Sequence, residues 1–175
     1  MKSEQLAWLI KRHGIEMTHL SHGSHIGSIL SVADIVAVLY NDVANITPEN
    51  VKDENRDRIV LSKGHAGAAI YAALAEKGFF PVEELKTHYA DGSRLSGHVS
   101  HKGIPGVEIS TGSLGHGACM ACGIALNAKL EKMSYFTYAI VGDGECDEGS
   151  IWEMALFANH FKLNQFVVIV DHNKM

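Results

Sequence analysis

Residues 142–149 read GDGECDEG, and four acidic side chains within six positions of this loop could bind a cation. Carboxylates are hard ligands that suit Mg²⁺ or Ca²⁺ rather than zinc. A calcium-binding EF-hand loop that started at Asp143 would need glycine at its sixth position and glutamate at its twelfth. Glu148 and Met154 stand there instead. Since Mg²⁺ usually takes few protein ligands and completes its shell with phosphate oxygens and water, the loop predicts a Mg²⁺ site beside a phosphate group.

A second stretch, TGSLGHG at 111–117, could contact such a phosphate. It opens a predicted helix over 114–130, and its glycines would let backbone N–H groups approach an anion at the positive helix end. It lacks the lysine ending of a Walker loop and does not match the dinucleotide fingerprint. Taken alone, the stretch fits an ordinary glycine-rich turn before a helix equally well.

Two apolar runs, 135–141 and 166–170, predict strands, and a helix is expected between them from about 150 to 161. A strand–helix–strand unit of this size makes its strands parallel, so their carboxyl ends lie at the same edge of the sheet. Asp143 follows the first strand and Asn173 follows the second. Ligands of open α/β sheets bind at that edge, so we expect these two side chains to converge.

Other segments predict the rest of an α/β domain. RIVLS at 58–62 predicts a buried strand, and the alanine-rich run 68–78 predicts a helix after it. Apolar residues near the N-terminus recur at helical spacing with an expected break near Gly14. SVAD at 31–34 resembles a capping box and predicts a helix start. The segment 91–113 is rich in Gly, Ser and His and predicts a long functional loop.

The composition indicates one globular domain over residues 1–175, with no nucleic acid or membrane as partner. The net charge is −5 and the basic residues are scattered, whereas phosphate backbones attract basic patches. No signal peptide is recognisable, and we expect no apolar run to approach the ~18 residues that a membrane span requires. Three cysteines form no disulfide framework, so a cytoplasmic protein is expected.

The order and spacing of four stretches resemble the N-terminal half of transketolase. They are GSHIGSILSVADIVAVLY (23–40), DRIVLSKGHAG (57–67), SGHVSHKGIPGVEISTGSLGHG (96–117) and the segment from GDGECDEG to the end (142–175). The resemblance implies the thiamine diphosphate-binding fold, a mostly parallel sheet flanked by helices, here with an incomplete C-terminal part. It also implies the cofactors thiamine diphosphate and Mg²⁺.

The resemblance assigns metal-binding and cofactor-binding roles to residues in three of these stretches. The metal ligands would be Asp143, Asn173 and the backbone carbonyl of Met175. Contacts to the cofactor would come from His65, Gly144, Asn173 and the turn formed by Gly112, Ser113 and Leu114.

Three more residues would serve the reaction itself. His25 and His98 correspond to histidines at the substrate mouth, which bind sugar hydroxyls and help to move protons. Histidine suits this task because its pKa lies near working pH. Glu148 corresponds to an acidic residue that joins a hydrogen-bonded link between paired active sites.

Two departures, Ile26 for proline and His116 for glutamine, resemble the shorter, two-subunit transketolases. Related domains continue beyond the position of Met175, and a separate domain that binds the aminopyrimidine supplies the glutamate that activates the cofactor. The resemblance therefore implies a partner subunit of the C-terminal transketolase type, in a dimer or heterotetramer. The expected activity is transfer of a two-carbon ketol unit between sugar phosphates. A carboligase of the deoxyxylulose phosphate synthase kind and a truncated, non-catalytic remnant remain as alternatives.

Overall fold

The computed structural model describes residues 1–174 and contains a three-stranded parallel sheet in the order β1-β2-β3. The strands are β1 (Arg58–Leu61), β2 (Thr137–Gly142) and β3 (Phe166–Asp171). Gly142 at the end of β2 pairs with Asp171 at the end of β3. The carboxyl ends of the strands thus meet at one edge, as expected from the strand–helix–strand unit.

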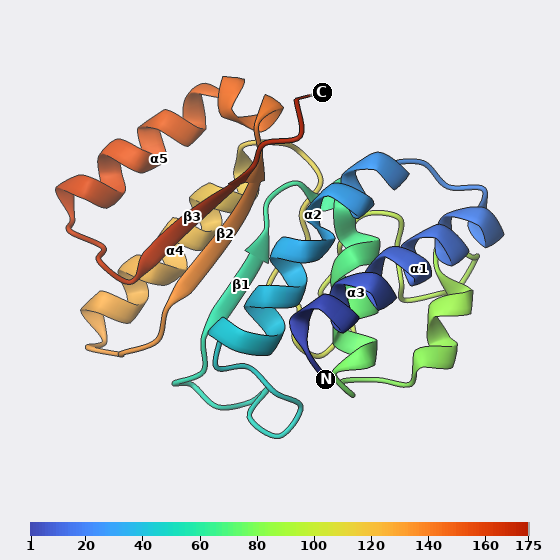
Figure 1. Cartoon of the computed structure of the whole chain (residues 1–175). Helices are drawn as coiled ribbons and strands as arrows, with labels where there is room; N and C mark the ends of the chain where they lie inside the picture. The colour runs from blue at the N-terminus through green and yellow to red at the C-terminus, as the bar shows by residue number, and fades with distance from the viewer. Residues whose placement is uncertain (175) are drawn as a thin grey trace.

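Helices cover both faces of this sheet (Figure 1). They are α1 (Ser3–Ser21), α2 (Ile26–Val38), α3 (Gly67–Glu76), α4 (His116–Leu130) and α5 (Gly149–His160). Short 3₁₀ turns, Gly64–Ala66 and Gly144–Asp147, follow β1 and β2 at the carboxyl edge. The α/β fold expected from the sequence, a parallel sheet flanked by helices, is confirmed.

Strand residues alternate between two hydrophobic clusters. Ile59 and Leu61 of β1 pack with residues of α1, α2 and α3, whereas Val60 packs with residues of α4 and α5. In β2, Ile140 joins the first cluster and Ala139 joins the second. Every residue of β2 is buried, as expected for a central strand with helices on both faces.

Two local predictions are wrong. Helix α1 runs without interruption through Gly14, where a break was expected. A Cβ atom added to Gly14 would lie 2.5 Å from Cγ2 of Ile29, so the glycine allows α1 and α2 to approach closely. Helix α2 begins at Ile26 rather than at the SVAD stretch, and the Ser31 hydroxyl donates to Asp171 of β3 instead of capping a helix.

The expectation that no segment approaches membrane-spanning length also needs correction. The helical segment Ile26–Val43 has 18 residues and a mean hydropathy of 1.5, enough by length and composition alone to cross a membrane. Its residues Val32, Ala33 and Val36 lie in the core cluster with α1 and α3. A core helix of this kind passes the same test, so the segment is weak evidence for a membrane span.

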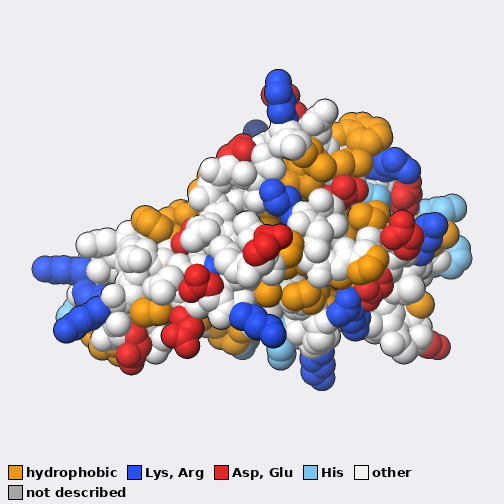
Figure 2. All heavy atoms as spheres, turned by 90° about the horizontal axis from the view of Figure 1, so that it is seen from below, with side chains coloured by type: hydrophobic (Ala, Val, Ile, Leu, Met, Phe, Trp, Pro, Cys, Tyr) orange, Lys and Arg blue, Asp and Glu red, His pale blue; other side chains and the backbone are white. Residues whose placement is uncertain are grey.

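Surface charge is mixed on the face that Figure 2 shows. Lys and Arg side chains lie among Asp and Glu side chains over this face, without gathering into one region. This face does not show the basic patch that binding to a phosphate backbone requires.

Candidate active site

A pocket of about 180 Å³ lies at the carboxyl edge of the sheet. Residues from the ends of all three strands, from α2 and from the turn before α4 line it: Ser28, Lys63, His65, Leu114, Gly142, Asp143, Gly144, Glu145 and Asn173. This is the edge at which open α/β sheets bind their ligands.

Asp143 and Asn173 lie at the same pocket, on neighbouring strand ends. The Asp143 amide donates to the Asp171 carbonyl at 3.2 Å, and the Lys174 amide donates to Oδ2 of Asp143 at 2.8 Å. The hydrogen bond from Lys174 lowers the pKa of the Asp143 carboxyl most, and a second one, from the Gly144 amide to Oδ1 at 3.1 Å, acts in the same direction. The carboxylate is therefore held in its ionised form beside the pocket. Met175, the third expected ligand, lies outside the described residues.

The donor set fits Mg²⁺ better than a metal that needs a complete protein cage. A carboxylate and a side-chain amide supply oxygen ligands, which Mg²⁺ prefers, and phosphate and water complete its shell. Among residues 1–174, no group of three or more His, Cys, Asp or Glu side chains could hold a metal. Asp143 and Asn173 are the residues that would hold Mg²⁺ here, and their role as ligands stays a prediction.

The three predicted histidines meet although they are far apart in sequence. The ring centroid of His25 lies 5.1 Å from that of His65 and 5.5 Å from that of His98. His65 is half-buried at the pocket wall, whereas the other two rings are exposed. Burial lowers the pKa of His65 to about 4, and the nearby charge of Lys63 acts in the same direction. The ring of His65 is consequently neutral near pH 7.

Helix α3 positions the loop that carries His98. The Tyr71 hydroxyl donates to the His98 carbonyl at 3.0 Å and accepts from the Ser100 amide at 2.8 Å. A Cβ atom at Gly67 would lie 2.5 Å from the Val99 nitrogen, so only glycine allows this approach. One buried hydroxyl and one glycine thus hold the His98 segment against the start of α3.

The glycine-rich turn before α4 reaches the site only in part. Leu114 lines the pocket, and a Cβ atom at Gly112 would lie 3.5 Å from the His98 ring. Ser113 is exposed. The expected supply of free N–H groups at the helix end needs correction, because the Gly115 amide already donates to the Glu145 carboxylate at 2.9 Å.

Glu148 lies at the N-cap of α5, where its side chain is exposed and makes no capping hydrogen bond. It is not among the residues that line the pocket. Its expected part in a link between paired sites therefore stays a prediction.

Three buried charged residues at or beside the pocket were not predicted as site residues: Lys63, Glu145 and Asp171. Lys63 is fully buried, and its ammonium lies 2.6 Å from Oδ2 of Asp171. One signal was available, since charged residues that directly follow or end a buried apolar strand must be paired or hydrogen-bonded.

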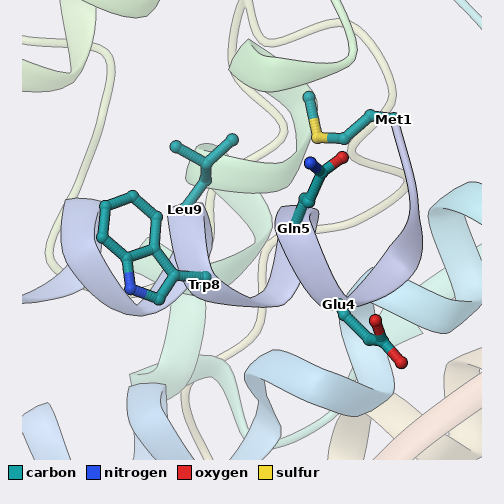
Figure 3. Close-up of a pocket in the computed structure, with 5 residues that line it drawn as sticks. All are labelled: Met1, Glu4, Gln5, Trp8 and Leu9. Carbon is teal, nitrogen blue, oxygen red and sulfur yellow. The ribbon is translucent and has the colours of Figure 1, made fainter.

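A larger hollow of about 570 Å³ lies elsewhere, on α1 (Figure 3). Its lining comes from the N-terminus and the first turns of one helix: Met1, Glu4, Gln5, Trp8 and Leu9. Because no other element contributes a polar group, this hollow lacks the converging side chains of a catalytic site.

Comparison with known families supports the resemblance. Residues 3–175 match the family model described as "Transketolase, thiamine diphosphate binding domain". The chain belongs to the transketolase family. The parallel sheet flanked by helices is the thiamine diphosphate-binding fold of that family.

Several curated transketolases are similar in sequence. One subunit of the apulose-4-phosphate transketolase of Phocaeicola vulgatus is 42% identical over 92% of this chain and 57% of its own length. The 6-deoxy-6-sulfo-D-fructose transketolase subunit SqwG of a Clostridium species is 44% identical over 86% of this chain and 55% of its own. Human transketolase is 40% identical over 92% of this chain and 26% of its own. The chain thus spans little more than half of the two bacterial subunits.

Solved transketolase structures have the same fold. A variant transketolase of Pichia stipitis matches with a TM-score of 0.93 and 31% identity, over 99% of this chain and 27% of its own. The enzyme of Campylobacter jejuni matches with a TM-score of 0.89 and 32% identity, over 96% of this chain and 28% of its own.

Proposed function

We propose that this chain is the thiamine diphosphate- and Mg²⁺-binding part of a transketolase-like enzyme, which transfers a two-carbon ketol unit between sugar phosphates. The observation that supports this most directly is that Asp143, Asn173, His65 and Gly144 line one pocket at the carboxyl edge. These four residues follow the ends of three different strands, and the family model that the chain matches is described as a thiamine diphosphate binding domain.

In this proposal, Asp143 and Asn173 hold Mg²⁺, which neutralises part of the diphosphate charge. Gly144 carries no side chain, so the cofactor can approach the backbone at the end of β2. Thiamine diphosphate itself supplies the carbanion chemistry when it is bound. The protein supplies binding, orientation and proton transfer.

The histidines divide these tasks according to their environment. His65, neutral near pH 7, can donate one hydrogen bond and accept another beside the diphosphate. The exposed rings of His25 and His98 bind sugar hydroxyls at the mouth and move protons there. Positioned general acid–base groups of this kind contribute roughly 10²–10⁴-fold in rate.

A second polypeptide belongs to the proposal. The relatives from Phocaeicola vulgatus and Actinobacillus succinogenes are each named as one subunit of an apulose-4-phosphate transketolase, which supports a separate subunit for the pyrimidine-binding domain. We place the chain, as one diphosphate-binding domain over residues 1–175, in a dimer or heterotetramer in the cytoplasm. Glu148, exposed at the start of α5, is available there for a contact with a second site.

The test compares Asp143→Asn with Asp147→Asn in the full-length protein, purified with any subunit that accompanies it. Asp147 belongs to the same turn but is exposed and lies outside the pocket. We expect Asp143→Asn to weaken calorimetric binding of Mg²⁺ and thiamine diphosphate by at least the ~10–100-fold that loss of a group supporting a metal site costs, and Asp147→Asn by no more than about twofold.

Activity assays on the unchanged protein separate the alternatives. Ketol transfer from a ketose phosphate to an aldose phosphate supports the proposal. Use of pyruvate as the donor would indicate a deoxyxylulose phosphate synthase-like enzyme instead. A protein that binds neither the cofactor nor Mg²⁺ would be a non-catalytic remnant.

A further inference from the structure

Glu145 is the member of the acidic loop whose side chain turns into the protein. It is 1% exposed and follows directly after Gly144. Its Oε1 accepts hydrogen bonds from the Ser62 hydroxyl and from the Gly115 amide, the latter at 2.9 Å. Its Oε2 accepts from the Gly142 amide at 3.2 Å. One carboxylate therefore takes donors from the end of β1, the start of α4 and the end of β2.

Ser62 extends this connection further into α4. Its hydroxyl donates to Glu145 and accepts from the Ala118 amide at 2.9 Å. Two N–H groups at the start of the helix, those of Gly115 and Ala118, are thus satisfied by Glu145 and Ser62. Gly117 makes the close approach possible, because a Cβ atom there would lie 2.6 Å from the Ser62 Cα.

This geometry makes Glu145 an acceptor for hydrogen bonds within the protein, whereas the nearby Asp143 is the proposed ligand of Mg²⁺. Both carboxylate oxygens of Glu145 already accept hydrogen bonds from within the protein, and the positive end of α4 favours its charge. Removing the carboxylate would leave three buried donors without this acceptor, which is costly for buried polar groups. The turn that presents Asp143 is therefore held on its inner side by Glu145.

We propose that Glu145 is a positioning residue for the cofactor pocket: it locks the turn that carries Asp143 and Gly144 to the end of β1 and the start of α4. The inference rests on the proposed function for what the pocket binds. The locking itself rests on the hydrogen bonds of the buried carboxylate.

The experiment uses Glu145→Gln in the full-length protein, with Asp147→Asn as the matched control. Glutamine keeps the volume but replaces one acceptor oxygen by a donor, so at least one of the three donors loses its partner. Trp152 is a natural reporter of the turn, since its indole N–H donates to the Cys146 carbonyl at 2.8 Å. Its fluorescence is followed while Mg²⁺ and thiamine diphosphate are added.

We expect Glu145→Gln to weaken binding of the cofactor with Mg²⁺ by about 10–100-fold, as loss of a supporting group around a metal site does, and the control to change it by less than about twofold. Amide hydrogen exchange should accelerate at Gly115 and Gly142 and stay unchanged in α1. Ser62→Ala, which keeps the carboxylate, should accelerate exchange at Ala118 and weaken binding less. This second variant tests the lock even where Glu145→Gln does not fold.

Equal cofactor affinity in Glu145→Gln and the control, with unchanged exchange at Gly115, would overturn the inference. If the unchanged protein itself binds no cofactor, the proposed function fails instead. Exchange at Gly115 and Ala118 then still decides whether Glu145 and Ser62 hold the turn.

Discussion

The buried ion pair between Lys63 and Asp171 offers the sharpest test of the packing under the pocket. Lys63 is fully buried, Asp171 is 4% exposed, and the ammonium and Oδ2 lie 2.6 Å apart. Lys63→Met keeps the apolar stem but leaves the Asp171 carboxylate with the Ser31 hydroxyl, which donates to Oδ1 at 2.6 Å. Removing one partner of a buried pair costs about 3–5 kcal/mol, so we expect the free energy of unfolding to fall by this amount.

A second ion pair of equal length provides the control. Lys11 and Asp34 also lie 2.6 Å apart, but their side chains are 38% and 64% exposed. Exposed pairs contribute about 0–1 kcal/mol, so Lys11→Met should change the free energy of unfolding by no more than that. Because the two distances agree, the difference between the variants measures the effect of burial.

Denaturant titrations of the full-length protein give both free energies, and thermal unfolding gives a second measure. For a protein of this size, 1 kcal/mol corresponds to roughly 2–4 °C, so Lys63→Met should lower Tm by about 6–20 °C and Lys11→Met by at most about 4 °C. Equal losses in the two variants would refute the reasoning. They would show that Asp171 finds new partners or water when the ammonium is removed.

Three further outcomes follow from single contacts. Tyr71→Phe removes one hydroxyl, so amide exchange at Ser100 should accelerate and stability fall by about 1–3 kcal/mol; unchanged exchange would contradict the contact. Gly117→Ala should lower the free energy of unfolding by about 1–3 kcal/mol in a denaturant titration, because the added Cβ would clash with the backbone of Ser62. Gly123→Ala, in open space on the same helix, should raise the free energy of unfolding by about 0.5–1 kcal/mol. Because the pKa of His65 is lowered to about 4, its contribution to stability is present above pH 6.5 and lost as pH falls from 6.5 towards 4. Its ring resonances in NMR, identified by His65→Gln, should stay constant from pH 7.5 to about 5.5, and a midpoint near 6.5 would contradict this.

The sequence predicts the strands and the residues at their ends because both signals are local. Apolar runs bounded by glycine and polar residues mark β1, β2 and β3, and the residues that bind ligands in such sheets follow directly. Asp143 and Asn173 therefore meet where the strand order places them. The histidines are different, since only the family resemblance brought His25, His65 and His98 together before the structure did.

Glycine and serine caused the errors of local structure. The sequence predicts a helix break at Gly14 because glycine is a poor helix former, yet the missing side chain of Gly14 allows close contact with Ile29 of another helix. Ser31 has the sequence context of a helix cap, yet its hydroxyl donates to Asp171. Glycine and serine can act on the backbone next to them, as a helix break or a helix cap, or they can contact a residue that is distant in the sequence. The sequence pattern alone indicates only the local role.

The hydrogen bonds and ion pair of the buried charged residues at the pocket could not be predicted either, because their partners are far apart in the sequence. They join Ser31 to Asp171, Lys63 to Asp171 and Ser62 to Glu145, over separations of 140, 108 and 83 residues. No window of neighbouring residues contains both partners of any such bond. A charged residue at a strand end signals that a partner is needed, but a local pattern does not show which residue that partner is. The acidic loop illustrates this. Asp143 and Glu145 look equivalent in sequence. Only the fold brings Ser62 and Gly115 to Glu145, so that its carboxylate holds neighbouring backbone in place while that of Asp143 stays beside the pocket.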